Sequence, residues 1–302
     1  MPELPDIQVY IEALERRVLG AEVTGVRVTS PAVLRTYDPP YDAPVGRNVR
    51  SLHRVGKRIV FGLGRGGRDS SDLFVVIHLM VAGRLRWEAP GKAIPRKVGL
   101  AAIDFEDGSL ILTEQGTHKR AGIWLFGEWD GVAQLDRGGV EPLEATSEEF
   151  ARALLAENRT LKRALTDPRI FSGIGNAYSD EILWDARLSP VKRTSQLAED
   201  EIARLRDSVV RSLEEWADRL RDDVGDGWPT KVTAFRDDMA VHGKYGEPCP
   251  RCGSTVQRIV YSSNETNYCA TCQTGGKLLA DRSLSRLLKD DWPKTLEELE
   301  EA

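Results

Sequence analysis

The sequence contains no apolar run of membrane-spanning length, and it shows no internal repeat. Its N-terminus, MPELPD, is acidic and lacks an apolar stretch, so we expect no signal peptide. Cysteine is nearly absent: there are four, all between Cys249 and Cys272, which fits a reducing cytosol. We therefore expect a cytosolic protein that makes no use of a membrane.

The chain also carries little net charge, −5 in total. Its 302 residues are enough for two domains with sizeable cores. Lys289–Ala302 holds six acidic and two basic side chains, a net of −4, so the other 288 residues carry only −1. Phosphate binding needs a local basic face rather than a basic total, so this balance does not exclude nucleic acid. The acidic tail is a candidate to cover a basic groove or to bind a partner.

The four cysteines form two CxxC pairs, Cys249/Cys252 and Cys269/Cys272, with sixteen residues between the pairs. A CxxC turn directs two thiolates at one centre, and two such turns complete a tetrahedral site suited to zinc. The alternatives are two disulfides or four unrelated thiols. We predict one structural Zn²⁺ whose closed shell supports a fold, on a β-hairpin with its tip at Ser262–Glu265.

The first half of the chain has the pattern of a helix followed by many short strands. Pro5 marks the start of a helix that ends near Leu19, before Gly20. Eight short alternating or apolar stretches follow, separated by Gly, Pro and Asp. They are Glu22–Thr29, Val49–His53, Lys57–Leu63, Leu73–Leu79, Arg84–Trp87, Gly99–Phe105, Ser109–Thr113 and Ile123–Phe126. This pattern predicts an eight-stranded antiparallel β-sandwich with a leading helix.

The second half is helical, so the fold class is α+β. Thr146 and Glu149 match a capping box. Helical patterns cover Ser147–Glu157, Thr160–Thr166, Asn176–Ala186, Glu199–Asp223 and Thr230–Ala240, and two short helices are expected at Leu278–Leu288 and Leu296–Glu300. We expect a β-sandwich domain (1–136), a helical domain (146–240), a zinc hairpin (241–277) and an acidic extension (278–302).

A glycine-containing turn lies between two of these helices. Gly173-Ile174-Gly175-Asn176 permits a tight turn, and a helix that starts near Asn176 presents free N–H groups suited to phosphate. Most such turns are only turns. Lys162, Lys192 and Arg193 lie nearby in sequence and strengthen the case for an anion site.

Five motifs occur together and in order: PELPD at the start, RVGKRIVF around Lys57, IHLMVAGRL around His78, KRALTDPRIFSGIGNAYSDEIL, and GEPCPRC…YCATCQ. Through these five motifs the chain resembles the formamidopyrimidine-DNA glycosylase/endonuclease VIII family of DNA repair enzymes. The resemblance runs from Pro2 to about Gln273. The resemblance implies that the helical domain is a helix–two-turns–helix element.

The resemblance also implies roles for individual residues. Family members remove the initiator Met and use the N-terminal proline, here Pro2, as nucleophile; a terminal amine has an ordinary pKa of about 8. Glu3 would move protons beside the sugar, and Lys57 would hold the target nucleotide. The expected DNA-binding residues are Lys57, Lys119, Arg120, Lys162, Asn176 and Asn264.

The chain departs from the family on the side that reads DNA. Asn264 stands where an arginine of the hairpin tip commonly contacts phosphate, and Glu265 follows it. Val81 occupies the position of an inserted methionine, with Met80 one residue earlier, and Ala121 occupies that of a phenylalanine. Valine and alanine cannot fill the gap left by a flipped base.

The resemblance implies a bifunctional DNA glycosylase and AP lyase. It would act as a monomer on double-stranded DNA with damaged bases or abasic sites, in a bacterial-type cytoplasm. The departures leave two alternatives open: a protein that binds damaged or abasic DNA without excising a base, and an AP lyase with little base excision.

Overall fold

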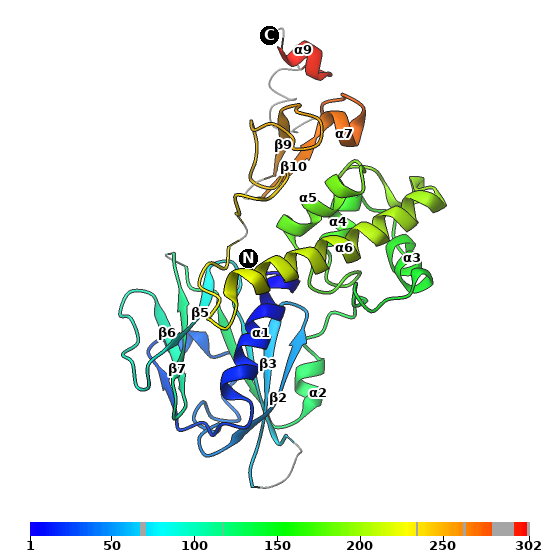
Figure 1. Ribbon diagram of the computed structural model, residues 1–302. Helices are drawn as coiled ribbons and strands as arrows, with labels where there is room; N and C mark the ends of the chain where they lie inside the picture. Colours follow the sequence, from blue (N-terminus) through cyan, green and yellow to red (C-terminus); the bar gives the residue numbers. More distant parts are fainter. Residues whose placement is uncertain (67–70, 117, 234, 262–263, 280–292, 301–302) are drawn as a thin grey trace. The chain divides into compact units, whose positions relative to one another are not determined.

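The computed structural model describes residues 1–66, 71–116, 118–233, 235–261, 264–279 and 293–300 (Figure 1). Two compact units are present, one formed by residues 1–137 and 216–233 and the other by residues 138–215 and 234–302. The division falls within the longest helix, α6 (Glu199–Val224). Among the described residues, every helix is too short or too polar to cross a membrane.

The first unit begins with α1 (Leu4–Val18). Pro5 suits the first turn of a helix, where no internal N–H bond is required. Apolar residues three and four positions apart then give the helix one buried face, which includes Ile7, Ile11 and Leu14. This face joins the core that lies between the two sheets.

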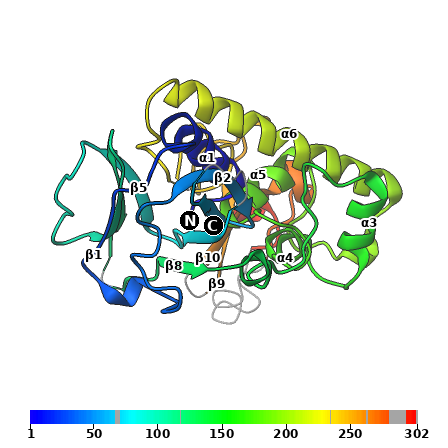
Figure 2. The same ribbon diagram turned by 90° about the horizontal axis from the view of Figure 1, so that it is seen from below.

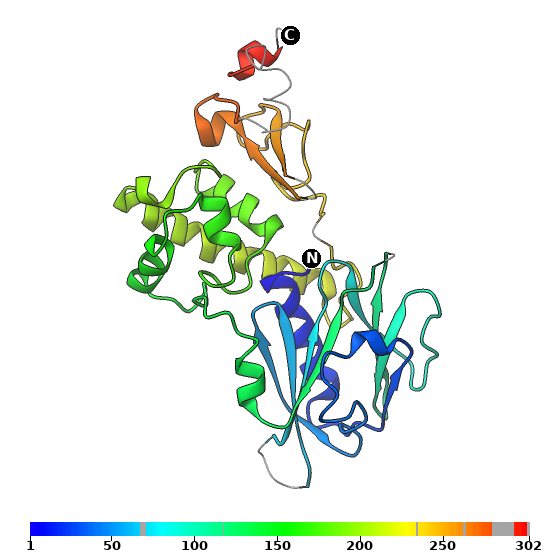
Figure 3. The ribbon, with the colours of Figure 1, turned by 180° about the vertical axis from the view of Figure 1, so that it is seen from behind.

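Two four-stranded antiparallel sheets lie on either side of α1 (Figures 1 and 3). One has the order β1-β6-β7-β5 and the other the order β2-β3-β4-β8. The strands are β1 (Gly25–Val28), β2 (Asn48–Val55), β3 (Arg58–Gly64), β4 (Leu73–His78), β5 (Gly83–Glu88), β6 (Gly99–Asp104), β7 (Ser109–Glu114) and β8 (Gly122–Phe126). The predicted eight-stranded sandwich with its leading helix is confirmed.

The first unit also contains two short helices, η1 (Pro31–Val33) before β2 and α2 (Trp129–Ala133) after β8. The last part of α6 also belongs to this unit. There Arg221 pairs with Glu12 of α1 at 2.7 Å. Farther on, the indole N–H of Trp228 donates to the carbonyl of Leu85 over 2.9 Å.

The second unit is helical and ends in a hairpin. Its helices are α3 (Ser147–Leu155), α4 (Leu161–Thr166), α5 (Asn176–Asp185), η2 (Thr194–Gln196) and the first part of α6 (Figure 2). The predicted capping box at α3 is present, since the Glu149 N–H donates to Thr146 Oγ1 over 3.2 Å. The hairpin is β9 (Val256–Tyr261) with β10 (Asn264–Cys269), followed by α7 (Ala270–Thr274) and α9 (Leu296–Glu300).

The predicted helix at Thr230–Ala240 is wrong, because the described residues of this range form turns and irregular backbone. Tertiary contacts hold the segment: Val232 is buried in the first unit, and the Ala240 N–H donates to the Glu181 carboxylate over 2.8 Å. The predicted helix at Leu296–Glu300 is confirmed. The one expected at Leu278–Leu288 lies largely outside the described residues.

Candidate active site and nucleic-acid interface

Glu3 and Asp6 fix the backbone beside Pro2. Glu3 is the N-cap residue of α1 and only 2 % exposed, and its N–H donates to the Asp6 carboxylate over 2.9 Å. The Ile7 N–H donates in turn to the Glu3 carbonyl over 3.0 Å. Pro2, itself buried, is therefore held directly outside a capped helix, while the Glu3 carboxylate stays within the same buried surroundings.

The terminal amine lies among charged side chains. Met1 carries this amine, and burial lowers its pKa below the ordinary 8.0. Glu3 raises that pKa, whereas Arg84 and Lys57 lower it, so all three side chains act on this end of the chain. The predicted residues Glu3 and Lys57 thus both lie within electrostatic reach of the end of the chain that carries Pro2.

Lys57 reaches this place from a turn rather than from a strand. It forms with Gly56 the two-residue connection between β2 and β3, where Val55 pairs with Arg58. Gly56 has a φ of 60°, a conformation that glycine adopts without strain. The predicted strand Lys57–Leu63 therefore starts one residue later than expected.

Arg84 was not predicted from the sequence. It follows Gly83 at the start of β5 and donates to the Gly83 carbonyl over 2.6 Å and to the Val81 carbonyl over 3.3 Å. Burial lowers the pKa of its guanidinium, with the charges of Tyr10 and Asp6 opposing that shift. The only available sequence signal was its place directly after the HLMVAG stretch.

The turn before Arg84 presents Val81 rather than Met80. Val81 is 57 % exposed, and Met80 has a φ of 54°, a conformation that few side chains other than glycine adopt. The Gly83 N–H closes the turn on the Leu79 carbonyl over 2.9 Å. The exposed apolar side chain of this turn is therefore that of Val81.

Glu114, at the end of β7, organises the loop that carries Lys119 and Arg120. Its carboxylate, 2 % exposed, accepts the N–H groups of Arg120 at 2.7 Å and of Ala121 at 2.9 Å. The Lys119 ammonium donates to the Glu114 carbonyl. Ala121 is 1 % exposed, whereas Arg120 is exposed, so Ala121 belongs to the core and cannot reach a ligand.

In the second unit, Lys162 and Asn176 lie together at the start of α5. The Lys162 ammonium donates to the Asn176 carbonyl and to the Asp180 carboxylate, both at 2.6 Å. Two of its three donors are thus engaged by the protein, and its side chain is 12 % exposed. Gly173, with a φ of 81°, makes the turn that precedes this helix start.

Two adjacent acidic residues of α5 are buried behind this site. Asp180, whose side chain is fully buried, also contacts His242 Nδ1 at 2.8 Å. Glu181 accepts the N–H groups of Ala240, Val241 and His242 at 2.8, 2.9 and 2.9 Å. Burial raises the pKa of Glu181, and these three donors oppose the shift. The segment that leads into the zinc module is therefore fixed to α5.

The four cysteine sulfurs lie within 4.8 Å of one another. All four are free thiols, and Cys252 Sγ and Cys269 Sγ are 3.4 Å apart, well beyond the roughly 2 Å of a disulfide bond. The Cys272 N–H points at Cys269 Sγ over 3.4 Å, and N–H donors of this kind stabilise metal-bound thiolates. The donor set fits one structural Zn²⁺, as predicted.

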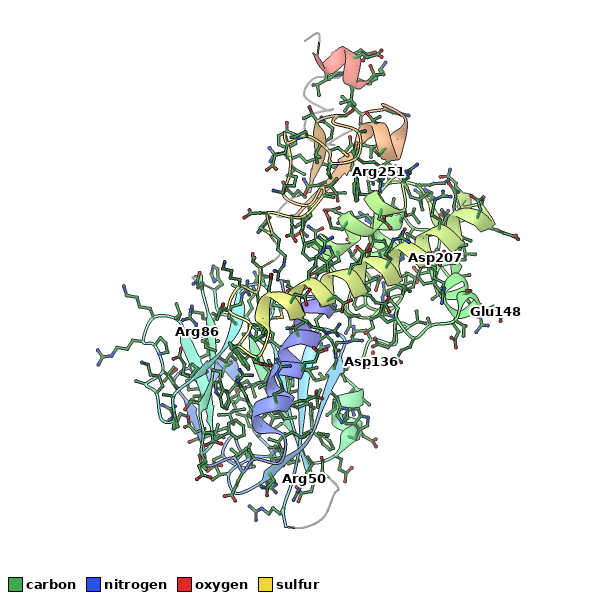
Figure 4. The ribbon with its side chains drawn as sticks, viewed as in Figure 1. Arg50, Arg86, Asp136, Glu148, Asp207 and Arg251 are labelled. Carbon is green, nitrogen blue, oxygen red and sulfur yellow. The ribbon has the colours of Figure 1, made fainter. Side chains whose placement is uncertain are left out.

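The zinc module (residues 246–275) is joined to the helices of its unit. The Trp184 indole N–H donates to Cys249 Sγ over 3.3 Å. Arg251, which is labelled in Figure 4, stacks on the Trp184 ring at 3.9 Å and donates to the Trp184 carbonyl over 2.8 Å. The Gln273 amide donates to the Leu188 carbonyl over 2.9 Å. These contacts join the first cysteine pair and the end of the module to α5 and to the residues that follow it.

The hairpin tip reaches Asn176. The Asn176 side-chain amide donates to the Glu265 carbonyl over 2.9 Å. Asn264, the predicted DNA-binding residue next to it, is exposed and pairs with Tyr261 in the strand register. Ser262 and Ser263 lie outside the described residues.

Three family models match the chain. They are the formamidopyrimidine-DNA glycosylase N-terminal domain over residues 1–118, the H2TH domain of the same enzymes over residues 139–220, and a zinc finger found in FPG and IleRS over residues 246–275.

Similar proteins span nearly the whole chain. A formamidopyrimidine-DNA glycosylase of Laribacter hongkongensis is 30 % identical over 90 % of this chain and 100 % of its own length. Another from Roseiflexus is 31 % identical over the same shares. The solved structure of Lactococcus lactis Fpg with DNA that contains an abasic site is 26 % identical, with a TM-score of 0.77 over 90 % of this chain and 99 % of that one. About a tenth of this chain has no counterpart in these relatives.

Proposed function

The chain belongs to the formamidopyrimidine-DNA glycosylase family, and we propose on that basis that Pro2 is the nucleophile of a base-excision DNA glycosylase with AP lyase activity. The observation that carries the proposal is the terminal amine. It is half-buried, its pKa is lowered, and Glu3, Lys57 and Arg84 all act on it. A DNA-binding protein without chemistry has no need of a terminal amine whose pKa is lowered in such surroundings.

Removal of Met1 converts the Pro2 nitrogen from an amide into a secondary amine. The surroundings that lower the pKa of the Met1 amine would act on this amine too, so a larger part of it is uncharged at neutral pH. Its lone pair attacks C1′ of the damaged nucleotide as the bond to the base breaks. The base leaves with that bond's electron pair and a proton.

Opening of the sugar ring gives an iminium ion between Pro2 and C1′. Loss of a proton from C2′ then expels the 3′ phosphate and nicks the strand, and water releases Pro2. In this proposal Glu3 gives and takes these protons, because its buried carboxylate belongs to the residue next to Pro2. Lys57 and Arg84 supply positive charge for the sugar's phosphates.

The second unit would hold the DNA. In the proposal Lys162 and Asn176 bind phosphate at the start of α5, with Asn264 on the hairpin, while Lys119 and Arg120 bind from the first unit. Residues 1–136 thus perform sugar chemistry, and residues 146–240 and 241–277 bind duplex. We place the protein as a monomer on the chromosome of a bacterial cytoplasm, in line with its bacterial relatives.

One observation favours a narrower second function, an AP lyase with little base excision. Ala121 is buried and Val81 is small, so the first unit has little apolar surface with which to replace a flipped base. An abasic site requires no such replacement. Arg120, next to Ala121 in sequence, is exposed and is the side chain best suited to fill the space left by a flipped base.

Borohydride trapping on a set of duplexes tests both functions. The substrates carry an abasic site, 8-oxoguanine or an oxidised pyrimidine, and the protein is the Met1-processed chain. Adducts on damaged bases that disappear with Pro2→Gly support the glycosylase, while adducts on abasic DNA alone support the lyase. No adduct on any substrate contradicts both.

A further inference from the structure

The hairpin of the zinc module carries a single basic side chain on its two strands. In the sequences of β9 and β10 this residue is Arg258. The tip position, where related enzymes commonly carry an arginine, holds Asn264, and Glu265 next to it is acidic. A hairpin that contacts phosphate through charge-assisted hydrogen bonds therefore has Arg258 as its only donor of that kind.

The strand register places Arg258 within reach of the tip. Arg258 pairs with Asn267, and Glu265 is two residues away on the same face of β10. Arg258 Nη1 lies 3.6 Å from Glu265 Oε2, and the two side chains are 45 % and 28 % exposed. An exposed ion pair at this distance is weak, so a phosphate can displace the carboxylate.

Tyr245 orients the guanidinium. The Arg258 Cζ atom lies 4.2 Å from the centre of the Tyr245 ring, and that ring is 51 % exposed. Stacking on a ring face leaves the edge of a guanidinium open to a bidentate partner. Arg258 is thus held in one plane while its N–H groups stay accessible to solvent.

Glu265 also links Arg258 to the start of α5. Its carbonyl accepts the Asn176 side chain over 2.9 Å, and the Asn176 carbonyl accepts Lys162 over 2.6 Å. Arg258, Asn176 and Lys162 therefore form one connected set of donors within the second unit. A phosphodiester that reaches the start of α5 would lie beside the backbone of Glu265, the residue whose carboxylate restrains Arg258.

We infer that Arg258 is the hairpin's phosphate-binding cation in this chain, and that Glu265 restrains it in the free protein and exchanges it for a DNA phosphate. The inference rests on the proposed function and deepens it, because it names a residue that replaces the missing tip arginine. Glu265 is then a positioning residue that acts through Arg258.

The test measures binding of the full, zinc-loaded chain to a duplex with a tetrahydrofuran abasic analogue, at several salt concentrations. Arg258→Gln is expected to weaken binding roughly tenfold and to lower the slope of log K against log[salt] by about 1. Arg258→Lys keeps the charge but loses the planar fork, and should restore the slope with only part of the affinity.

Arg211→Gln is the matched control. Arg211, on α6, is also exposed and paired with an acidic residue. Its partner Asp185 ends α5, about 14 Å along the helix from Asn176. The Arg211→Gln variant should bind DNA with the affinity and salt slope of the parent chain. Parent-like affinity and salt slope for Arg258→Gln, with normal zinc content, would overturn the inference.

A double-mutant cycle tests the role of Glu265. Glu265→Gln should raise affinity about threefold, and this gain should vanish when Arg258→Gln is also present. A gain that persists without Arg258 would mean that Glu265 repels phosphate directly, which contradicts the exchange.

Trapping on an abasic duplex separates the two proposals. If the parent chain forms the covalent adduct and Arg258→Gln binds normally, the role of Arg258 in phosphate binding is rejected. The proposed function then still stands. A processed parent chain that binds the analogue but forms no adduct rejects the chemistry instead. The role of Arg258 in binding is then judged by its own affinity and salt slope.

Discussion

Trp184 donates its indole N–H to the Sγ atom of Cys249 over 3.3 Å, from the helix that also begins with Asn176. A donor to a metal-bound thiolate fixes the ligand and stabilises its negative charge. Trp184→Phe keeps most of the ring under Arg251 but removes this N–H, and should lower zinc affinity about tenfold. Competition with a chromogenic chelator measures it.

Trp129→Phe is the control for that measurement. Trp129 is 42 % exposed and packs on Phe74 in the first unit, so its loss should leave zinc affinity unchanged. Equal zinc affinity for Trp184→Phe and the parent chain would show that the indole is only a packing group.

Removal of zinc should abolish duplex binding although zinc takes no part in the chemistry. Cys269 provides one thiolate and is also the N-cap of α7, so Cys269→Ser disturbs both metal and hairpin. Binding to an abasic-analogue duplex should fall at least about a hundredfold, as it should on chelation. Undiminished binding by Cys269→Ser would contradict a role for the hairpin in holding DNA.

Glu114→Ala should loosen the loop that carries Arg120. The buried carboxylate accepts two backbone N–H groups, and its removal leaves both without that partner, at a cost of about 1–3 kcal/mol in unfolding free energy. Urea denaturation measures this cost. Glu106→Ala, at an exposed position before β7, is the control, and equal stabilities for the two variants would contradict the account.

His78 makes stability depend on pH. Burial, together with the charges of Arg58 and Lys57, lowers its pKa to about 4. The unfolded chain then binds the proton more tightly than the folded one, so stability falls as the pH drops from about 6.5 to about 4. The loss is no more than about 3 kcal/mol.

His78→Gln should flatten the stability profile within that window and leave it unchanged above pH 7. Unfolding free energies measured by urea at half-unit pH steps reveal the difference. A parent chain and variant with parallel profiles from pH 6.5 to 4 would exclude His78 as the cause.

The sandwich was predictable because its strands alternate or are apolar and are bounded by Gly, Pro and Asp. The zinc ligands were predictable because CxxC spacing is a local geometric requirement. The segment at Thr230–Ala240 has helical spacing too, but its N–H groups at Ala240 and Val241 bind Glu181, about sixty residues earlier. A periodic sequence pattern cannot predict a hydrogen bond with a residue as distant in sequence as Glu181.

Arg84 and Glu114 were missed for the same reason. Each acts through an interaction set by the fold: the charge of Arg84 on the terminal amine, and the hydrogen bonds of Glu114 with the backbone of Arg120 and Ala121. The exposed side of the turn at Met80 and Val81 likewise depended on a left-handed φ at Met80, which a strand pattern does not predict.

The central claim is that the Pro2 nitrogen bonds to C1′, and the most direct measurement locates that bond. Met1-processed protein is trapped with borohydride on an abasic duplex, digested, and sequenced by tandem mass spectrometry. We expect a deoxyribose adduct on the N-terminal peptide, attached to the Pro2 nitrogen, and none on protein that retains Met1. An adduct on a lysine such as Lys57, or an equal yield from the Met1-retaining chain, would contradict it.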